Sequence, residues 1–190
     1  MASITVLRPD VHQEAADAFP PAPPPTPDRP LVLTLIDNGK PKARELLTAI
    51  AGELGALVPL ASVEVVRKEA AARLLSEDDA RAIAARSDIV IAGLGDCGAC
   101  SACSVDDAVE MQRRGVPAVV VISDVFQGLA ASFAASRGLA ACPTAVVPHP
   151  VSSKSDAHIA ELARRVVGTV HQQLLGRPAP VAVPVGAAAR

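Results

Sequence analysis

The stretch SDIVIAGLGDCGACSACSVDDAVEMQRRGVPAVVVI, residues 87–122, carries the clearest structural signal in the chain. It opens on an apolar run at residues 88–93 and closes on a second one at residues 117–122. A glycine- and cysteine-rich segment and a stretch with helical spacing, residues 104–115, lie between them. Short continuous apolar runs are typical of strands buried on both faces of a parallel sheet. The stretch therefore predicts a strand–helix–strand unit with parallel strands.

The same alternation continues on both sides of this unit. We expect further strands at residues 31–36, 62–66 and 144–148, and further helices at residues 42–54, 76–87, 125–138 and 156–175. Five strands alternating with five helices predict a three-layer α/β fold with a mostly parallel sheet. Right-handed crossovers favour the flavodoxin-like strand order 2-1-3-4-5, with the more polar second strand at an edge. Ser104 and Asp107 resemble a capping box, which predicts that their helix begins there.

The ends of the chain differ in composition from its middle. Residues 1–29 lead into and include most of the proline-rich run FPPAPPPTPDRP, which favours an extended arm outside the core. Residues 30–175 are long and apolar enough to form a single α/β domain. Residues 176–190, rich in alanine and proline, form a tail in this interpretation.

Composition and charge exclude several classes of partner. The formal net charge is −2 and only 2% of the residues are aromatic, which argues against nucleic-acid binding. The longest apolar runs are too short to cross a membrane, and the first residues lack the order of a signal peptide. We therefore expect a cytoplasmic protein, where clustered cysteines are more often catalytic or metal-binding than structural.

Polar and reactive residues follow the predicted strands. They are Asp37, Asn38, Lys40, Asp96, Cys97, Cys100, Ser123, Asp124 and His149. The carboxyl ends of parallel strands meet at one edge of the sheet, and the predicted order sets the first strand beside the third. The sequence thus predicts a ligand site at this edge, with Asp37, Cys97, Asp124 and His149 around a shared pocket.

Gly93, Gly95 and Gly98 spell the G-x-G-x-x-G pattern of dinucleotide-binding loops. However, the pattern follows the third strand rather than the first, and Asp96 would repel a pyrophosphate. A flavin is equally weakly indicated, because the chain has no Trp or Tyr to flank its ring. The alternative interpretation is that these glycines only let the backbone turn tightly.

A metal site is the stronger alternative. Cys97, Cys100 and Cys103 are spaced C-x-x-C-x-x-C, and Cys142 precedes a proline, as in iron–sulfur ligation; zinc would also accept four thiolates. Cys142, however, is expected at the opposite edge of the sheet, roughly 17–20 Å away. We therefore interpret Cys142 as a small buried hydrophobe and expect no cofactor, with an iron–sulfur cluster or zinc as the alternative.

A strand, a C-x-x-C pair and a helix also form the thioredoxin arrangement, in which the helix N-terminus stabilises a thiolate. In that interpretation Cys97 is the more exposed, attacking thiol. Cys100, near the helix start, is placed to resolve the adduct or to close a disulfide.

The motifs around these cysteines resemble those of a known family. GLGDCGACSACSVDDAVEMQRRGVP is similar to the core of the UGSC family of bacterial proteins, where selenocysteine or cysteine begins a U/C-G-S-C loop. LIDNGKPKARELL, SDVF and VPHPV resemble the family's D-N-x-K-P, D-x-F and V-P-H-P motifs, so the resemblance covers about residues 31–175. Ala99 replaces the usual serine, and Cys103 stands where a bulky residue is expected.

A more distant resemblance links the loop to the substrate-binding selenoprotein subunit of glycine reductase. In that subunit a selenocysteine in a U-x-x-C setting attacks a substrate carbon and an amine is lost. The resemblance implies that Cys97 takes the place of the selenocysteine and that Cys100 is its partner.

Together these observations predict a thiol-dependent enzyme in which Cys97 attacks an electrophilic carbon of a small metabolite and Cys100 resolves the adduct. Asp96 is expected to orient the thiol, and His149 to act as acid or base. The expected substrate-binding residues are Asp37, Asn38, Lys40, Gly95, Gly98, Cys103, Ser123 and Asp124. His158 and His171 are expected at the surface.

The expected partners are a small-molecule substrate, an external thiol or reductase, and either a second copy of the chain or a partner subunit; neither nucleic acid nor a membrane is expected. The alternative function is an iron–sulfur or zinc-binding subunit, or a sulfur carrier or partner subunit of a larger reductase.

Overall fold

The computed structural model describes residues 16–26, 28–139 and 141–176. Within them lies one parallel sheet in the order β2-β1-β3-β4-β5, which confirms the predicted fold and strand order. The strands are β1 (Leu31–Asp37), β2 (Leu60–Arg67), β3 (Ile89–Gly95), β4 (Ala118–Ser123) and β5 (Thr144–Val147).

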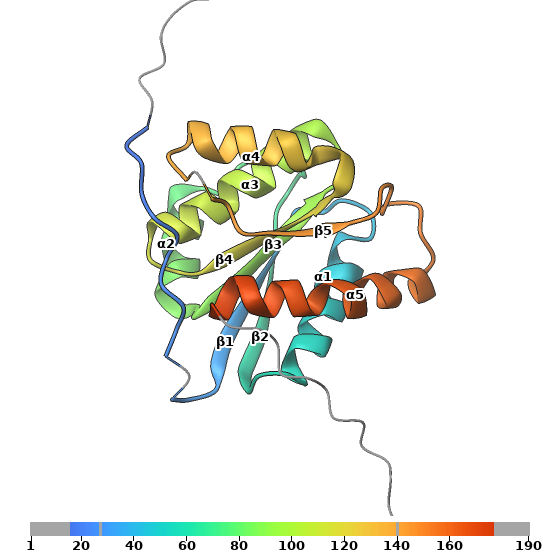
Figure 1. Ribbon diagram of the computed structural model, residues 1–190, viewed down its shortest axis with the longest axis horizontal. Coiled ribbons are helices and arrows are strands. Elements are labelled where there is room, and N and C mark those ends of the chain that lie inside the picture. The colour runs from blue at the N-terminus through green and yellow to red at the C-terminus, as the bar shows by residue number, and fades with distance from the viewer. Residues whose placement is uncertain (1–15, 27, 140, 177–190) are drawn as a thin grey trace, which may run out of the picture.

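Helices cover both faces of the sheet (Figure 1). The helices are α1 (Ala43–Gly55), α2 (Glu77–Arg86), α3 (Gly98–Arg113), α4 (Gln127–Ser136) and α5 (Asp156–Leu175), with a 3-10 turn at Asp124–Phe126 before α4. α1 and α5 pack on one face, and α2, α3 and α4 pack on the other. The short apolar runs of the sequence form β1, β3 and β4, which are buried on both faces.

Burial follows the position of each strand in the sheet. Every residue of β3 is buried, as expected for a central strand. β2 lies at the edge, where Val63 and Val65 remain 44% and 37% exposed. The prediction of a partly exposed edge strand is confirmed.

Helix α3 begins at Gly98 rather than at residue 104, so the predicted capping box is wrong. Ser104 and Asp107 lie inside the helix and are buried. The helix extends back because its first turns consist of small residues that fit against the sheet, and because Cys97 serves as its N-cap. The cysteine segment is therefore the first turn of a helix and not a loop before one.

The described part of the proline-rich arm lies against the body of the same chain. The N–H of Phe19 donates to the carbonyl of Gly138 (2.9 Å), and the guanidinium of Arg113 stacks 4.6 Å from the Phe19 ring centre. Further along, Arg29 forms an ion pair with Asp88 (2.7 Å). The first 15 residues and the tail after residue 176 lie outside the described residues.

Helix α5 buries a broad face that includes Val170 and Leu174. His171 lies beside them and is 1% exposed, so its expected surface position is wrong. His158, one residue before the buried Ile159, is half-buried. Within the described ranges, no helix is long and apolar enough to cross a membrane.

Candidate functional site

The structure brings the predicted site residues to the carboxyl edge of the sheet. Asp37 ends β1, Asp96 and Cys97 follow β3, Ser123 ends β4, and His149 lies just after β5. The parallel strands cause this convergence, since all their carboxyl ends point the same way.

Cys97 and Cys100 form a disulfide with their sulfurs 2.04 Å apart. Cys97 is half-buried, whereas Cys100 is fully buried against the first turn of α3. The Cys97 sulfur accepts the N–H of Cys100 (3.3 Å), so it occupies the N-cap position of a 16-residue helix. In the reduced protein, free N–H groups and the helix dipole at such a position favour a thiolate over a thiol.

Asp96 is bound to the segment after β5. Its carboxylate accepts the N–H groups of Val151 (3.1 Å) and Ser152 (3.0 Å) and the Ser152 hydroxyl (2.7 Å). It also lies 3.0 Å from Nδ1 of His149. Burial alone would raise the pKa of Asp96, but the hydrogen bonds from Ser152 and Val151 outweigh it and lower the pKa. Asp96 is therefore an anion that holds His149.

The hydrogen bonds around His149 assign its tautomer. The Ser123 hydroxyl donates to the carbonyl of Gly95 (3.3 Å), and its oxygen lies 3.0 Å from Nδ1 of His149. Because the neighbouring Asp96 carboxylate can only accept, Nδ1 carries the proton. In the neutral ring Nε2 is then a base, and no described residue hydrogen-bonds to it.

Asp124 and Phe126 complete the support of His149. The Asp124 carboxylate accepts the N–H of His149 (3.2 Å), and the Phe126 ring meets the imidazole edge-on at 5.8 Å between ring centres. Sequence reasoning missed Phe126, Val151 and Ser152. Phe126 ends the SDVF motif, Val151 ends the VPHPV motif and Ser152 follows it, and this was the signal that pointed to them.

Asn38 is a brace between β1 and α3. Its Nδ2 donates to the carbonyl of Leu94 (2.9 Å) and to the hydroxyl of Ser104 (3.0 Å), while its Oδ1 accepts the N–H of Lys40 (3.1 Å). The side chain is fully buried. Its hydrogen-bonding atoms are thus used inside the protein, and Asn38 positions the turn that carries Lys40.

The two glycines predicted to bind substrate sit in different surroundings. A Cβ on Gly95 would lie 2.6 Å from Ile122 Cγ2 and 2.9 Å from the Ser101 hydroxyl, so glycine is needed there for packing. A Cβ on Gly98 would meet no atom within 4 Å. The backbone beside the cysteine pair is therefore open to an approaching molecule.

A cleft of about 330 Å³ lies between the β1–α1 turn and the end of β2. Its lining includes Asp37, Lys40, Arg44 and Arg67. Asp37 is 1% exposed, and its Oδ1 accepts the N–H of Gly39 (2.8 Å). The lining of this cleft does not include Cys97, Asp124 or His149, so the predicted residues divide between two parts of the edge.

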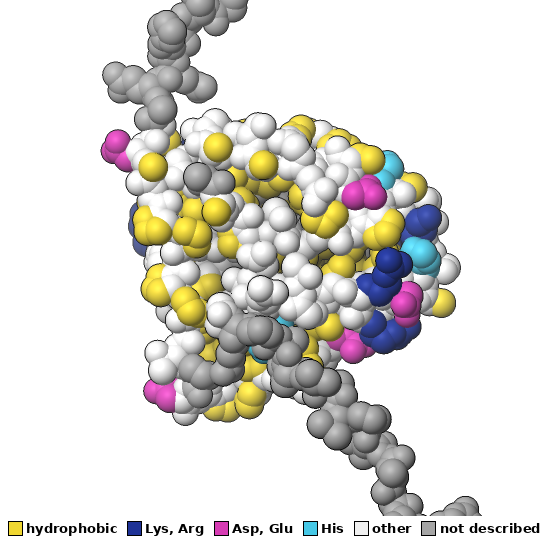
Figure 2. Space-filling model, viewed as in Figure 1, with side chains coloured by type: hydrophobic (Ala, Val, Ile, Leu, Met, Phe, Trp, Pro, Cys, Tyr) yellow, Lys and Arg dark blue, Asp and Glu magenta, His cyan; other side chains and the backbone are white. Residues whose placement is uncertain are grey.

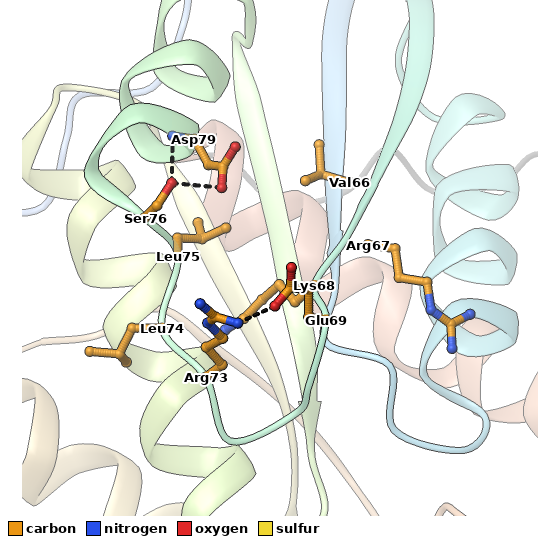
Figure 3. A pocket seen from close by; sticks show the side chains of 9 residues that line it. All are labelled: Val66, Arg67, Lys68, Glu69, Arg73, Leu74, Leu75, Ser76 and Asp79. Atoms are coloured by element: carbon orange, nitrogen blue, oxygen red, sulfur yellow. Dashed lines mark hydrogen bonds and ion pairs between the residues drawn. The ribbon is translucent and has the colours of Figure 1, made fainter.

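A second cleft, of about 400 Å³, lies between β2 and α2 (Figure 3). Lys68 lines it and forms a buried ion pair with Asp107 of α3, the two side chains being 4% and 1% exposed. Burial raises the pKa of Asp107 to about 6 although the Lys68 ammonium opposes the shift. Sequence reasoning missed this pair, because only the fold brings the end of β2 to α3.

Cys103 lies on α3 one turn before Asp107 and is half-buried. Burial raises the pKa of its thiol; the ammonium of Lys68 works against the shift, and the carboxylates of Asp107 and Asp106 add to it. The charges that act on Cys103 are thus those of Lys68, Asp107 and Asp106, and its environment differs from that of Cys97.

The cysteines do not gather as metal ligands. Cys142 precedes β5, at the opposite edge from the Cys97–Cys100 pair, and burial raises the pKa of its thiol to about 12. Cys142 packs against the core on the α3 side, as its interpretation as a small hydrophobe predicted. Among the described residues, no three His, Cys, Asp or Glu side chains lie where they could hold one metal ion. The four cysteines therefore do not fit a four-thiolate site.

No curated protein matches the chain. Among solved structures, a flavodoxin-like domain from Synechococcus sp. is 16% identical and covers 75% of this chain and 92% of its own, with a TM-score of 0.44. A diflavin flavoprotein A3 from Nostoc sp. is also 16% identical and covers 78% of this chain and 99% of its own, with a TM-score of 0.40. We draw nothing about ligands from these likenesses. The model of the UGSC family matches residues 5–176, and the chain belongs to this family.

Proposed function

We propose that the protein is a thiol-dependent enzyme in which Cys97 attacks an electrophilic carbon of a small metabolite. The observation that carries the proposal is the position of the Cys97 sulfur: it caps α3, accepts the Cys100 N–H and is half-buried. Such a position stabilises the thiolate, which is the nucleophilic form of cysteine.

The reaction has two steps. The Cys97 thiolate forms a carbon–sulfur bond, and the electron pair leaves with a leaving group such as an amine or moves to a carbonyl oxygen. The Cys100 thiolate then attacks the Cys97 sulfur, which forms the disulfide and leaves the electron pair of the broken carbon–sulfur bond on carbon. A proton completes the new carbon–hydrogen bond, so the substrate gains two electrons and the dithiol loses two.

His149 is the proposed proton carrier. With Nδ1 bound to Asp96, Nε2 of the neutral ring takes a proton, and the resulting imidazolium gives it to the leaving group or to the product carbon. The Asp96 carboxylate stabilises that imidazolium, in the manner of the buried carboxylate in a catalytic triad. Asp96 is a positioning residue in this scheme, and it acts through His149 rather than on the thiol.

Two further considerations support the proposal. The distant resemblance to the selenoprotein subunit of glycine reductase sets Cys97 where selenium serves as a strong nucleophile. In addition, closing the disulfide stops turnover, so the scheme needs an external thiol or reductase, which a reducing cytoplasm supplies.

Mass spectrometry of cysteine variants tests the division of labour. Reduced protein is treated with a panel of imines, carbonyls and activated alkyl compounds. Cys97→Ser should form no adduct, because a hydroxyl without a strong base is a poor nucleophile. Cys100→Ser should accumulate the adduct on Cys97 without turnover, and Cys142→Ser should behave as wild type.

Two results would contradict the scheme. Adduct formation by Cys97→Ser would end the role of Cys97 as nucleophile. Full turnover by Cys100→Ser would leave Cys100 a structural residue. For the proton carrier, His149→Gln should lower the rate of turnover by roughly 10²-fold or more while the variant still forms the adduct.

A further inference from the structure

The cleft beside the β1–α1 turn is rich in positive charge. Lys42 pairs with Asp156 (2.6 Å) and Glu45 (3.7 Å), so its charge is balanced. The remaining charged lining consists of Lys40, Arg44 and Arg67 around one carboxylate, Asp37. Figure 2 shows Lys and Arg side chains, with Asp, Glu and His side chains among them, at the end of the molecule where the β5–α5 connection turns in Figure 1. Three cations facing one anion leave the cleft able to accept a negative group.

The two arginines flank Asp37 in long ion pairs and make no hydrogen bond to it. Arg44 and Arg67 are 53% and 59% exposed, and they lie 3.7 Å and 3.9 Å from Oδ2 of Asp37, beyond hydrogen-bond distance. Arg67 also borders the second cleft, and in Figure 3 its guanidinium points away from Lys68, toward the side where α1 lies. Both guanidinium groups therefore remain available as donors to an anion.

Asp37 supplies a hydrogen-bond acceptor in the same cleft. Its side chain is 1% exposed, and within the described part of the chain no group donates a hydrogen bond to Oδ2. A buried carboxylate oxygen without a donor is costly, because burial removes its water. A ligand hydroxyl or amine would satisfy it.

The start of α1 adds to the attraction. Lys42 is the N-cap residue of this 13-residue helix and makes no side-chain cap hydrogen bond. The N–H of Ala43 donates to the carbonyl of Lys40 (3.0 Å), which leaves the N–H groups of Arg44 and Glu45 in the first turn without a side-chain cap. Such N–H groups and the positive end of the helix dipole favour anions.

From these observations we infer that the cleft binds a small anion that carries a hydroxyl or amine next to its carboxylate or phosphate group. Arg44, Arg67 and Lys40 hold the negative group, and Oδ2 of Asp37 accepts the hydrogen bond from the neighbouring donor. This site goes beyond the proposed thiol chemistry and stands independently of it, because none of its residues carries a proton or an electron in that scheme.

Binding of three probes tests the inference. Glycolate, acetate and inorganic phosphate are titrated into the isotope-labelled full chain at constant ionic strength, and amide NMR shifts around Lys40 give the Kd. Glycolate should bind about threefold or more tighter than acetate, because only glycolate has a hydroxyl for Asp37. A phosphate that binds more tightly than glycolate assigns the natural ligand to the phosphate esters; the reverse order assigns it to the carboxylates.

Charge variants locate the site. Arg67→Gln and Arg44→Gln should each weaken all three probes roughly five- to tenfold, the loss expected for one charged hydrogen bond. Arg81→Gln, an equally exposed arginine on α2, is the matched control and should change nothing. If the Arg67→Gln variant bound all three probes as tightly as the Arg81→Gln control, the inference would be overturned.

Asp37→Asn separates the donor subsite from the anion subsite. Its Oδ1 can still accept the Gly39 N–H, while an N–H₂ group replaces Oδ2. Glycolate should lose its advantage over acetate, and acetate should bind at least as tightly as before. A glycolate advantage that survives in Asp37→Asn would refute the role of Oδ2. Since the readout is binding, its result is separate from any failure of the cysteine variants.

Discussion

Replacing Asp96 with asparagine should both destabilise the fold and release His149. The carboxylate accepts three hydrogen bonds from Val151 and Ser152 and one from His149. A bond to a charged acceptor contributes about 1.5–3 kcal/mol, against about 0.5–1.5 kcal/mol for a neutral one. Weakening three of them by about 1 kcal/mol each predicts a loss of about 3 kcal/mol for Asp96→Asn.

The pH dependence has a definite sign. The pKa of Asp96 is lowered below its ordinary value of 3.8, so the charged form stabilises the folded state. That stabilisation is fully present above pH 3.8 and is lost as the pH falls through the lowered folded pKa. Asparagine does not titrate. The difference between wild type and Asp96→Asn should therefore shrink on acidification.

Urea unfolding followed by circular dichroism measures the loss of stability and its pH dependence. Circular dichroism is used because the chain has no Trp or Tyr for fluorescence. Ser152→Ala is the matched control: it removes only one hydroxyl donor and should cost about 1.5 kcal/mol. An Asp96→Asn variant within about 0.5 kcal/mol of wild type at pH 7 would show that the hydrogen bonds to this carboxylate contribute little. An undiminished difference at pH 3 would refute the assigned role of its charge.

Two further predictions concern the ends of β3 and α3. In reduced protein at neutral pH, iodoacetamide should modify Cys97 faster than Cys142, because burial raises the pKa of Cys142 to about 12. Mass spectrometry measures the two rates, and equal labelling of all four cysteines would contradict the prediction. Gly95→Ala should cost about 2–3 kcal/mol in urea unfolding, since its Cβ would lie 2.6 Å from Ile122, whereas Gly98→Ala should be neutral or stabilising by up to about 1 kcal/mol. Similar costs for the two alanines would refute this packing argument.

The fold was predictable because its signals are local. Apolar runs, the helical spacing between them and right-handed crossovers were enough for the strand order, and the order brought residues such as Asp37 and Cys97 to one edge. The start of α3 was not predictable in the same way. Ser104 and Asp107 have the spacing of a cap, but their burial between α3 and its neighbours overrides that local pattern. Local signals specify an element, and tertiary contacts decide where it begins.

The partner of each polar side chain was beyond local reasoning. Asp96 precedes Cys97 in sequence, which suggested that it orients the thiol, yet its oxygens bind Val151 and Ser152 some 55 residues away. The pairing of Lys68 with Asp107 had no sequence signal, because it depends on the approach of β2 to α3. Contacts between distant segments follow from the packing of elements and cannot be read from spacing.

Hydrogen-bond satisfaction separates the residues that position the site from those left for a ligand. Asn38 and Asp96 are buried and use their polar atoms on neighbouring segments, so a substrate would have to displace bonds within the protein to reach them. Cys97 is half-buried, and Nε2 of His149 and Oδ2 of Asp37 have no hydrogen-bond partner among the described residues. Because an unsatisfied buried atom is costly unless something binds it, Oδ2 of Asp37 is where an incoming molecule gains most. His149 is exposed and Cys97 is half-buried, so a molecule can also reach Nε2 and the Cys97 sulfur. The Asn38 amide is bonded to both Leu94 and Ser104, so it connects the end of β1 to β3 and α3.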